Sequence, residues 1–213
     1  MRLFACVSLM LLLSACGRPE TAAVPLNQPA ARQPAPTAAP ALAQTAVVAA
    51  PTVVPLAATA VPPAPLPDGY DAPDFVGGQE WLNSKPLTLA DLRGKVVLVD
   101  FWTYSCYNCR NTLPALRGWW AKYKDQGLVI VGVHTPEFSS EHELDNVRKA
   151  VADQEIGWPV IQDNDSAIWR SYNNHYWPHM YLVDSRGKVI YDHIGEGAYD
   201  TTEQWIQTAL ANR

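Results

Sequence analysis

Cysteine is scarce in this sequence, because its 213 residues contain only four, at positions 6, 16, 106 and 109. Small extracellular domains that rely on disulfides for stability need more cysteines, spread along the chain. The sequence therefore argues against a disulfide framework. The close pair Cys106 and Cys109 indicates chemistry instead of cross-linking.

An excess of positive charge is also missing. The formal net charge is −5, only 17% of the residues are charged, and the sequence shows no basic patch. Proteins that bind nucleic acids usually carry such a patch, so this composition argues against that class of function.

The N-terminal segment is too short for a transmembrane helix. Arg2 is its only charge, and its apolar run ends at Leu13, well short of the roughly 20 residues that span a bilayer. Residues 1–15 are therefore predicted to be a secretory signal peptide. The ending Leu13-Ser-Ala-Cys16 resembles the bacterial lipobox, which implies cleavage before Cys16 and lipid attachment to it. An ordinary signal peptide followed by a chance cysteine is the alternative.

The segment from Gly17 to about Pro67 has almost no charge and no aromatic residue, and consists mainly of Ala, Pro, Val and Thr. Its regularly spaced prolines forbid a helix, and it has no amphipathic period. Residues 16–70 are therefore predicted to be a disordered, lipid-anchored linker. The remaining residues, 71–213, are enough for one domain with a full hydrophobic core.

Hydrophobic periodicity predicts an α/β domain. The near-continuous apolar runs 95–102 and 127–134 are typical of parallel strands buried on both faces, and the amphipathic segment 107–124 between them makes a right-handed βαβ unit. The other predicted helices are 141–154, capped by Ser140, then 166–172 and 201–211. The other predicted strands are 158–161, a hairpin of 180–183 with 188–191, and an N-terminal edge hairpin of 80–83 with 86–89.

The cysteine pair falls where the first strand ends and the helix begins. A thiol at a helix N-terminus lies close to unpaired N–H groups, which favour the thiolate. Lowering a thiol pKa from about 8.5 to about 7 takes roughly 2 kcal/mol, and a helix N-terminus supplies a good part of it. Cys109 lies one turn after Cys106 on the same helix face, so the two can form a disulfide. The pair is predicted to be a thiol–disulfide redox site.

Several motifs together resemble the thioredoxin fold, and within it the TlpA/ResA redoxins and the DipZ type of thioredoxin-like domain. They are Phe101-Trp-Thr-Tyr-Ser-Cys-Tyr-Asn-Cys109, Val133-His-Thr-Pro-Glu-Phe138, Asp163-Asn-Asp165 and Tyr176-Trp-Pro178. The resemblance implies a three-layer α/β/α sandwich with a central mixed sheet.

The resemblance also implies roles for individual residues. Cys106 matches the attacking cysteine, Cys109 the buried resolving cysteine, and Pro178 the cis-proline that faces them. Asp100 matches a buried aspartate that exchanges protons with the resolving thiol. A carboxylate within an apolar strand is costly unless it is protonated or partnered, which supports that role.

The substrate groove is predicted to include Trp102, Tyr107, Asn108 and Trp177. One departure from the ResA pattern is Thr112, which stands where those proteins have a glutamate and leaves Asp100 as the better candidate for proton transfer.

Three further residues receive no catalytic role from the sequence. His134 and His179 either lie near the disulfide and tune it or are ordinary surface histidines, and the sequence does not choose between the two. Glu137 lies in a family motif without an assigned role.

These features predict an extracytoplasmic thiol–disulfide oxidoreductase, lipid-anchored to a bacterial membrane and acting as a reductant. Family resemblance suggests protein disulfide clients, apocytochrome c among them, and a CcdA-like membrane electron donor. The only redox group is the Cys106–Cys109 disulfide, without a further cofactor. No metal is expected, because no second CxxC or Cys/His pair has ligand spacing.

Two alternatives use the same fold. A thiol peroxidase would need the Pro-x-x-x-Thr/Ser-x-x-Cys spacing of peroxiredoxins, which is absent before Cys106. A copper-delivery module of the Sco type would use a CxxxC pair with a distant histidine, for which His134 is the candidate.

Overall fold

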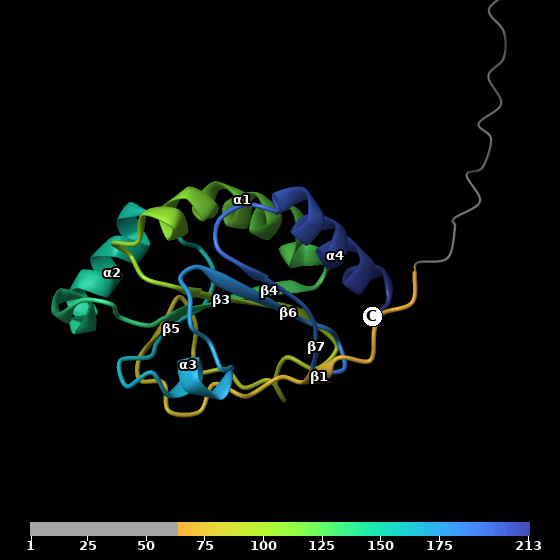
Figure 1. Cartoon of the computed structure of the whole chain (residues 1–213), viewed down its shortest axis with the longest axis horizontal. Coiled ribbons are helices and arrows are strands. Elements are labelled where there is room, and N and C mark those ends of the chain that lie inside the picture. The colour runs from red at the N-terminus through yellow and green to blue at the C-terminus, as the bar shows by residue number, and fades with distance from the viewer. Residues whose placement is uncertain (1–63) are drawn as a thin grey trace, which may run out of the picture. The chain divides into compact units, whose positions relative to one another are not determined.

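A seven-stranded sheet with the order β1-β7-β6-β3-β4-β5-β2 forms the centre of the computed structural model, which describes residues 64–213 (Figure 1). The strands are β1 (Tyr70–Asp71), β2 (Trp81–Leu82), β3 (Val96–Trp102), β4 (Leu128–His134), β5 (Val160–Gln162), β6 (His179–Val183) and β7 (Lys188–Ile194). The helices are α1 (Tyr107–Tyr123), α2 (Leu144–Asp153), α3 (Ala167–Ser171) and α4 (Tyr199–Ala211), with short 3₁₀ helices η1 (Lys124–Gln126) and η2 (Ser139–His142). The predicted signal peptide and most of the predicted linker lie outside the described residues.

Strand β3 is the central strand, and all seven of its residues are buried. It pairs in parallel with β4 and antiparallel with β6, so the sheet is mixed, as predicted. The strand-helix-strand unit β3-α1-β4 is confirmed, and so is the terminal hairpin of β6 and β7.

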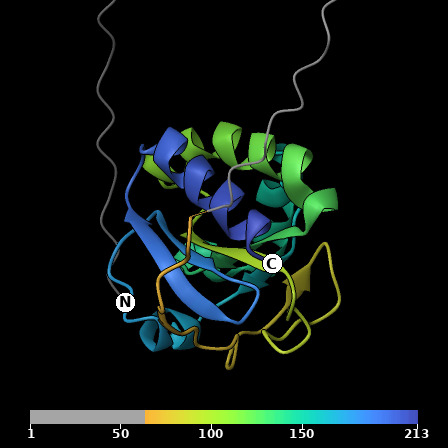
Figure 2. The same ribbon diagram turned by 90° about the vertical axis from the view of Figure 1, so that its right-hand side faces the viewer.

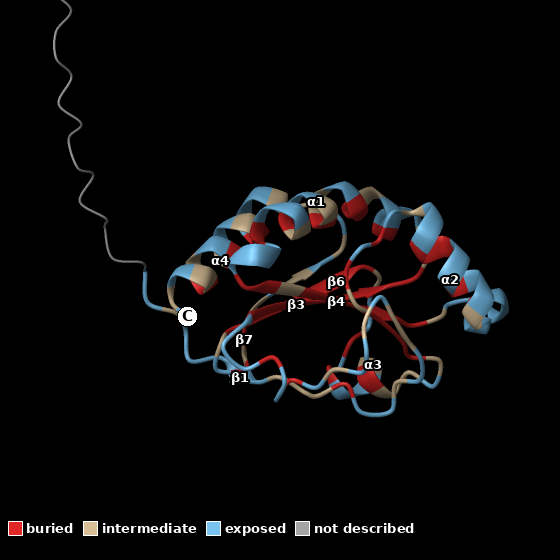
Figure 3. Cartoon of the chain, turned by 180° about the vertical axis from the view of Figure 1, so that it is seen from behind, coloured by how far each residue is buried: buried red, intermediate tan, exposed pale blue. Residues whose placement is uncertain are grey.

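The helices and the sheet form three layers. Helices α1, α2 and α4 cover one face of the sheet, and α3 lies on the other (Figures 1 and 3). Alternate residues of β3 enter the two cores. Leu98 and Trp102 pack on the α1 side, whereas Val99 and Phe101 pack on the α3 side. This double burial explains why the strand reads as a continuous apolar run.

The predicted N-terminal edge hairpin is wrong. β2 pairs with β5 at one edge of the sheet, and β1 pairs with β7 at the opposite edge. Residues 86–89 form no strand. Instead, the Asp91 carboxylate accepts hydrogen bonds from the backbone N–H and the hydroxyl of Thr88. The segment before β3 runs over the α3 side of the sheet (Figures 1 and 2). Leu89 and Leu92 of this segment are buried there, and they cover apolar surface that the five-residue α3 leaves open.

Two helix starts also differ from prediction. Helix α2 begins at Leu144 instead of Glu141, because η2 precedes it and turns the Glu141 side chain into the interior, so Ser140 is not its cap. Helix α4 begins at Tyr199, two residues before the predicted start. Within residues 64–213, no helix is both long enough and apolar enough to cross a membrane.

Candidate active site

Three loops meet at the C-terminal end of β3. The register pairs Trp102 with His134 of β4, and Phe101 with His179 of β6. The loop that follows β3, the loop that follows β4 and the loop that precedes β6 therefore leave the sheet at the same end. The first loop ends in Cys106, and the third contains Pro178.

Cys106 is the N-cap residue of α1 and is partly exposed. Its Sγ accepts a hydrogen bond from the backbone N–H of Cys109 at 3.2 Å. The pKa of Cys106 is lowered to about 7, first by the hydrogen bond from the Cys109 thiol and then by the N–H groups of Cys109 and Asn108. Partial burial and the charge of Glu137 oppose this shift without reversing it. Cys106 is therefore an effective thiolate nucleophile near neutral pH.

Cys109 has the opposite properties. It is buried, with 3% of its surface exposed, and both cysteines are free thiols in the described chain. Burial raises the pKa of Cys109 strongly, and so does its hydrogen bond to Cys106. At neutral pH one thiol of the pair is thus a partly exposed nucleophile, and the other holds its proton.

Asp100 is buried in β3, and its Oδ1 atom has no hydrogen-bond partner among residues 64–213. Burial raises the pKa of Asp100 to about 7, with a further contribution from the negative charge of Cys106. The charge of Asp100 in turn raises the pKa of Cys109. The carboxyl group is therefore electrostatically coupled to both thiols, and its pKa suits proton transfer at neutral pH.

The predicted groove residues lie at different depths. Tyr107 is 69% exposed, and Asn108 is also exposed, whereas Trp102 is buried. Trp177 is partly buried, and its Nε1–H donates a hydrogen bond to the Thr135 carbonyl at 3.0 Å. The Trp177–Pro178 peptide bond is cis, as the family resemblance implies.

Thr112 does not replace the missing glutamate. Its buried hydroxyl donates a hydrogen bond to the Asn108 carbonyl at 2.9 Å, within α1. Asp100 is thus a buried carboxyl group whose pKa responds to the charge of Cys106.

Of the two interpretations that the sequence left open for His134, the structure excludes the surface one. His134 is fully buried, and its ring lies against Trp102 and Tyr104. Its Nε2 atom lies 3.3 Å from the Thr103 hydroxyl, and burial lowers its pKa to about 4. His134 is therefore a neutral residue of the core beneath the Cys106 loop.

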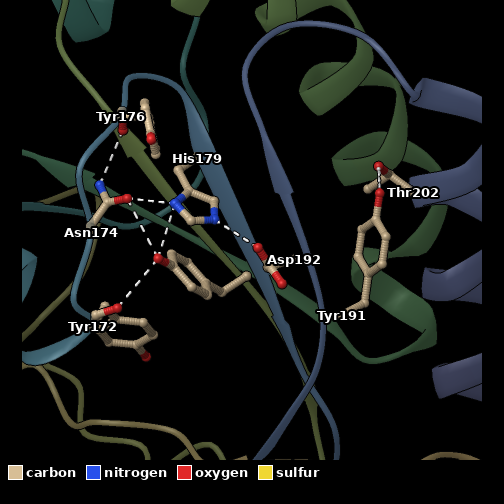
Figure 4. Close-up of polar contacts among 8 residues, drawn as sticks. Tyr172, Asn174, Tyr176, His179, Tyr191, Asp192 and Thr202 are labelled. Carbon is tan, nitrogen blue, oxygen red and sulfur yellow. Dashed lines mark hydrogen bonds and ion pairs between the residues drawn. The ribbon is translucent and has the colours of Figure 1, made fainter.

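His179 is likewise buried and is not a surface histidine. Its Nδ1 atom lies 2.5 Å from Asn174 Oδ1 and its Nε2 atom 3.0 Å from Asp192, with the Tyr181 hydroxyl also in contact (Figure 4). Burial lowers the pKa of His179. This network lies with Tyr181 on the α3 side of the sheet, whereas Cys109 packs on the α1 side.

Glu141 was not predicted to have a role, although its side chain lies next to the site. It is fully buried and accepts hydrogen bonds from Ser105, the residue before Cys106. The sequence feature that could have indicated this role is the spacing of Glu141, three residues after Phe138, where the turn begins. The acid of a capping box has this spacing, and Glu141 accepts the Phe138 N–H in the same way. Among residues 64–213, no group of three or more His, Cys, Asp or Glu side chains is arranged to hold a metal ion.

Comparison with known proteins agrees with this geometry. Residues 69–192 match the model of the AhpC/TSA family, which is more than half of the chain. The chain belongs to the AhpC/TSA family. It has the thioredoxin-like fold that the sequence predicts.

Curated proteins that resemble the chain include a much longer one. The chain is similar to protein DipZ of Mycobacterium tuberculosis, with 47% identity over 142 residues that cover 65% of this chain and 20% of DipZ. It is also similar to the thiol-disulfide oxidoreductase ResA of Bacillus subtilis, with 32% identity over 59% of this chain and 66% of ResA. The chain thus spans about a fifth of the length of DipZ.

Solved structures of single domains match over nearly their full length. A thioredoxin-like protein in its oxidised form has a TM-score of 0.62 at 28% identity, over 68% of this chain and 97% of its own. The thioredoxin domain of a thiol-disulfide oxidoreductase from Bacteroides vulgatus has a TM-score of 0.54 at 31% identity, over 67% of this chain and 99% of its own.

Proposed function

We propose that the protein is a thiol–disulfide oxidoreductase that exchanges disulfides with other proteins through Cys106 and Cys109. The observation that carries this proposal is the contrast between the two thiols. The pKa of Cys106 is about 7 at the start of α1, and the neighbouring Cys109 is buried and keeps its proton. An attacking and a resolving thiol require this difference.

In the first step, the Cys106 thiolate attacks one sulfur of a client disulfide. A Cys106–client disulfide forms, and the other client sulfur leaves as a thiolate. In the second step, Cys109 loses its proton and attacks Cys106 Sγ, which releases the second client sulfur. The client gains two electrons, and the Cys106–Cys109 disulfide is the oxidised product. A dithiol reductant must then restore the pair.

Asp100 is proposed as the base of the second step. Formation of the mixed disulfide removes the negative charge of Cys106, which contributes to the raised pKa of Asp100. The pKa of Asp100 therefore falls at this moment, and its carboxylate becomes available to take the proton of Cys109.

The proposed location is extracytoplasmic, with the protein lipid-anchored to a bacterial membrane. The signal sequence and the lipobox-like ending at Cys16 support extracytoplasmic attachment through a lipid. We further propose that the protein acts as a reductant of disulfides in apocytochrome c or other exported proteins, with electrons from a CcdA-like membrane donor. The similarity to DipZ and ResA supports this role. Fractionation tests the anchor, since Cys16→Ser should move the protein from the membrane to the soluble fraction.

The central test is the reduction of insulin disulfides by the wild type and by Cys106→Ser. The wild type should accelerate insulin precipitation with a dithiol reductant present, whereas Cys106→Ser should match the rate without protein. Cys109→Ser should instead accumulate a covalent complex with insulin. Equal rates for the wild type and Cys106→Ser would refute the proposal. A reduction potential near −270 mV would indicate a reductant, and one near −120 mV an oxidant.

A further inference from the structure

The carboxylate of Glu141 joins two of the three loops that surround Cys106. We propose that Glu141 is a positioning residue that holds the loop carrying Cys106 against the loop that follows β4. This inference rests on the proposed function only in naming Cys106 as the nucleophile, and it is tested separately. Hydrogen-bond donors from both loops converge on the two carboxylate oxygens of Glu141.

Each carboxylate oxygen of Glu141 accepts hydrogen bonds from one loop. Its Oε1 atom accepts from the hydroxyl of Ser105 at 2.5 Å and from the Ser105 N–H at 3.3 Å. Its Oε2 atom accepts from the N–H groups of Glu137 at 2.7 Å and Phe138 at 3.0 Å. A single buried side chain thus connects the residue before the nucleophile with the loop that follows β4.

A second line of contacts fixes the same loop from beneath. The Thr103 hydroxyl lies 3.3 Å from Nε2 of the buried His134, and the Thr103 side chain also helps to lower the pKa of Glu141. The Thr103 carbonyl accepts the N–H of Cys106 at 3.3 Å. The residues that lead to Cys106 are therefore held at Thr103 and at Ser105.

Glu141 is stable as a buried anion because of these donors. Burial alone would raise its pKa, but the hydrogen bonds from Ser105, Thr103 and the two backbone N–H groups outweigh burial and lower it. A carboxylate serves here because it offers two acceptor oxygens. A glutamine at this position has one oxygen and one NH₂ group, so one of the two pairs of donors would face another donor.

A positioning role and a purely electrostatic role of Glu141 predict opposite changes in the pKa of Cys106. If Glu141 acted only through its negative charge, its removal would favour the Cys106 thiolate and lower the thiol pKa. If Glu141 holds the loop, its removal disturbs the N-cap geometry in which Cys106 Sγ accepts the Cys109 N–H at 3.2 Å. The Cys106 pKa then rises, and the direction of the change distinguishes the two roles.

Glu137 supplies the matched control. It is the adjacent carboxylate whose charge raises the pKa of Cys106. Glu137→Gln therefore removes the same charge as Glu141→Gln and keeps the Glu137 N–H that Glu141 binds. The control should lower the Cys106 pKa, whereas Glu141→Gln should raise it.

The experiment measures the rate at which iodoacetamide alkylates Cys106 in the reduced full-length protein between pH 5 and 9. A rise of one pKa unit decreases the thiolate fraction at pH 6 about tenfold, and we expect a loss of this order for Glu141→Gln. Ser105→Ala, which removes one hydroxyl donor at an exposed position, should slow alkylation by a smaller factor in the same direction. Glu137→Gln should accelerate it.

Unchanged or faster alkylation in a folded Glu141→Gln protein would overturn the inference. If circular dichroism shows that Glu141→Gln does not fold, the test rests on Ser105→Ala. An unchanged pH midpoint of Cys106 alkylation in Ser105→Ala would then overturn the inference as well. Alkylation needs no client disulfide. Failure of insulin reduction by the wild type would therefore refute the proposed function and leave the Glu141 result to be judged separately.

Discussion

Replacement of Asp100 by asparagine should remove a loss of stability that the wild type suffers as the pH rises. Asp100 is buried, and its pKa rises from 3.8 to about 7 in the folded protein. A raised pKa means that the native state holds the proton more tightly than the unfolded chain. This contribution to stability is complete below pH 3.8 and is lost as the pH rises to about 7.

The magnitude follows from the shift. A difference of about three pH units, at about 1.4 kcal/mol each, means that ionisation of Asp100 costs the native state about 4 kcal/mol at alkaline pH. Asparagine has nearly the same shape and cannot ionise. The free energy of unfolding of Asp100→Asn minus that of the wild type should therefore rise by about 4 kcal/mol between pH 4 and pH 8. It should be constant above that range.

Urea unfolding of the reduced proteins at pH 4 to 9 measures this difference. Asp125→Asn is the control, because it removes the same charge at an exposed position and should give a constant difference. The oxidised protein should show a smaller rise, since it lacks the Cys106 thiolate that contributes to the shift. A constant difference for Asp100→Asn would show that Asp100 does not keep its proton, and it would remove Asp100 from the proposed mechanism.

Three further predictions concern the surroundings of the site. Burial lowers the pKa of His134 from 6.5 to about 4, so its contribution to stability is present above pH 6.5 and is lost as the pH falls to 4. In urea unfolding, the free energy of unfolding of His134→Gln should therefore decrease by about 3 kcal/mol less than that of the wild type between pH 6.5 and pH 4. Cys109→Ala removes the largest cause of the lowered Cys106 pKa, so the alkylation midpoint of Cys106 should move to higher pH, and an unchanged midpoint would contradict this. Asp163 accepts N–H hydrogen bonds from α3 through both carboxylate oxygens, so Asp163→Asn should destabilise the protein by about 1–3 kcal/mol in urea, whereas an equal midpoint would show that these bonds contribute nothing.

Local patterns were sufficient to predict the centre of the fold. Strand β3 is buried on both faces, so its residues are apolar without alternation, and that run is visible in the sequence. The end of this apolar run also predicted that Cys106 lies at the start of α1. The edges were harder, because β1 and β2 have two residues each and carry no periodic signal. Their partners, Val189 and Ile161, are far away in the chain.

The sequence by itself determined that two cysteines stand one helical turn apart after a buried strand, since spacing and periodicity are local properties. Only the tertiary structure decided that His134 and His179 are buried and that Glu141 reaches the loop before Cys106. The Ser105–Glu141 hydrogen bond joins residues 36 positions apart, and no pattern in either segment specifies it. Burial and long-range hydrogen bonds depend on how the strands pair, and these contacts set the pKa values around Cys106.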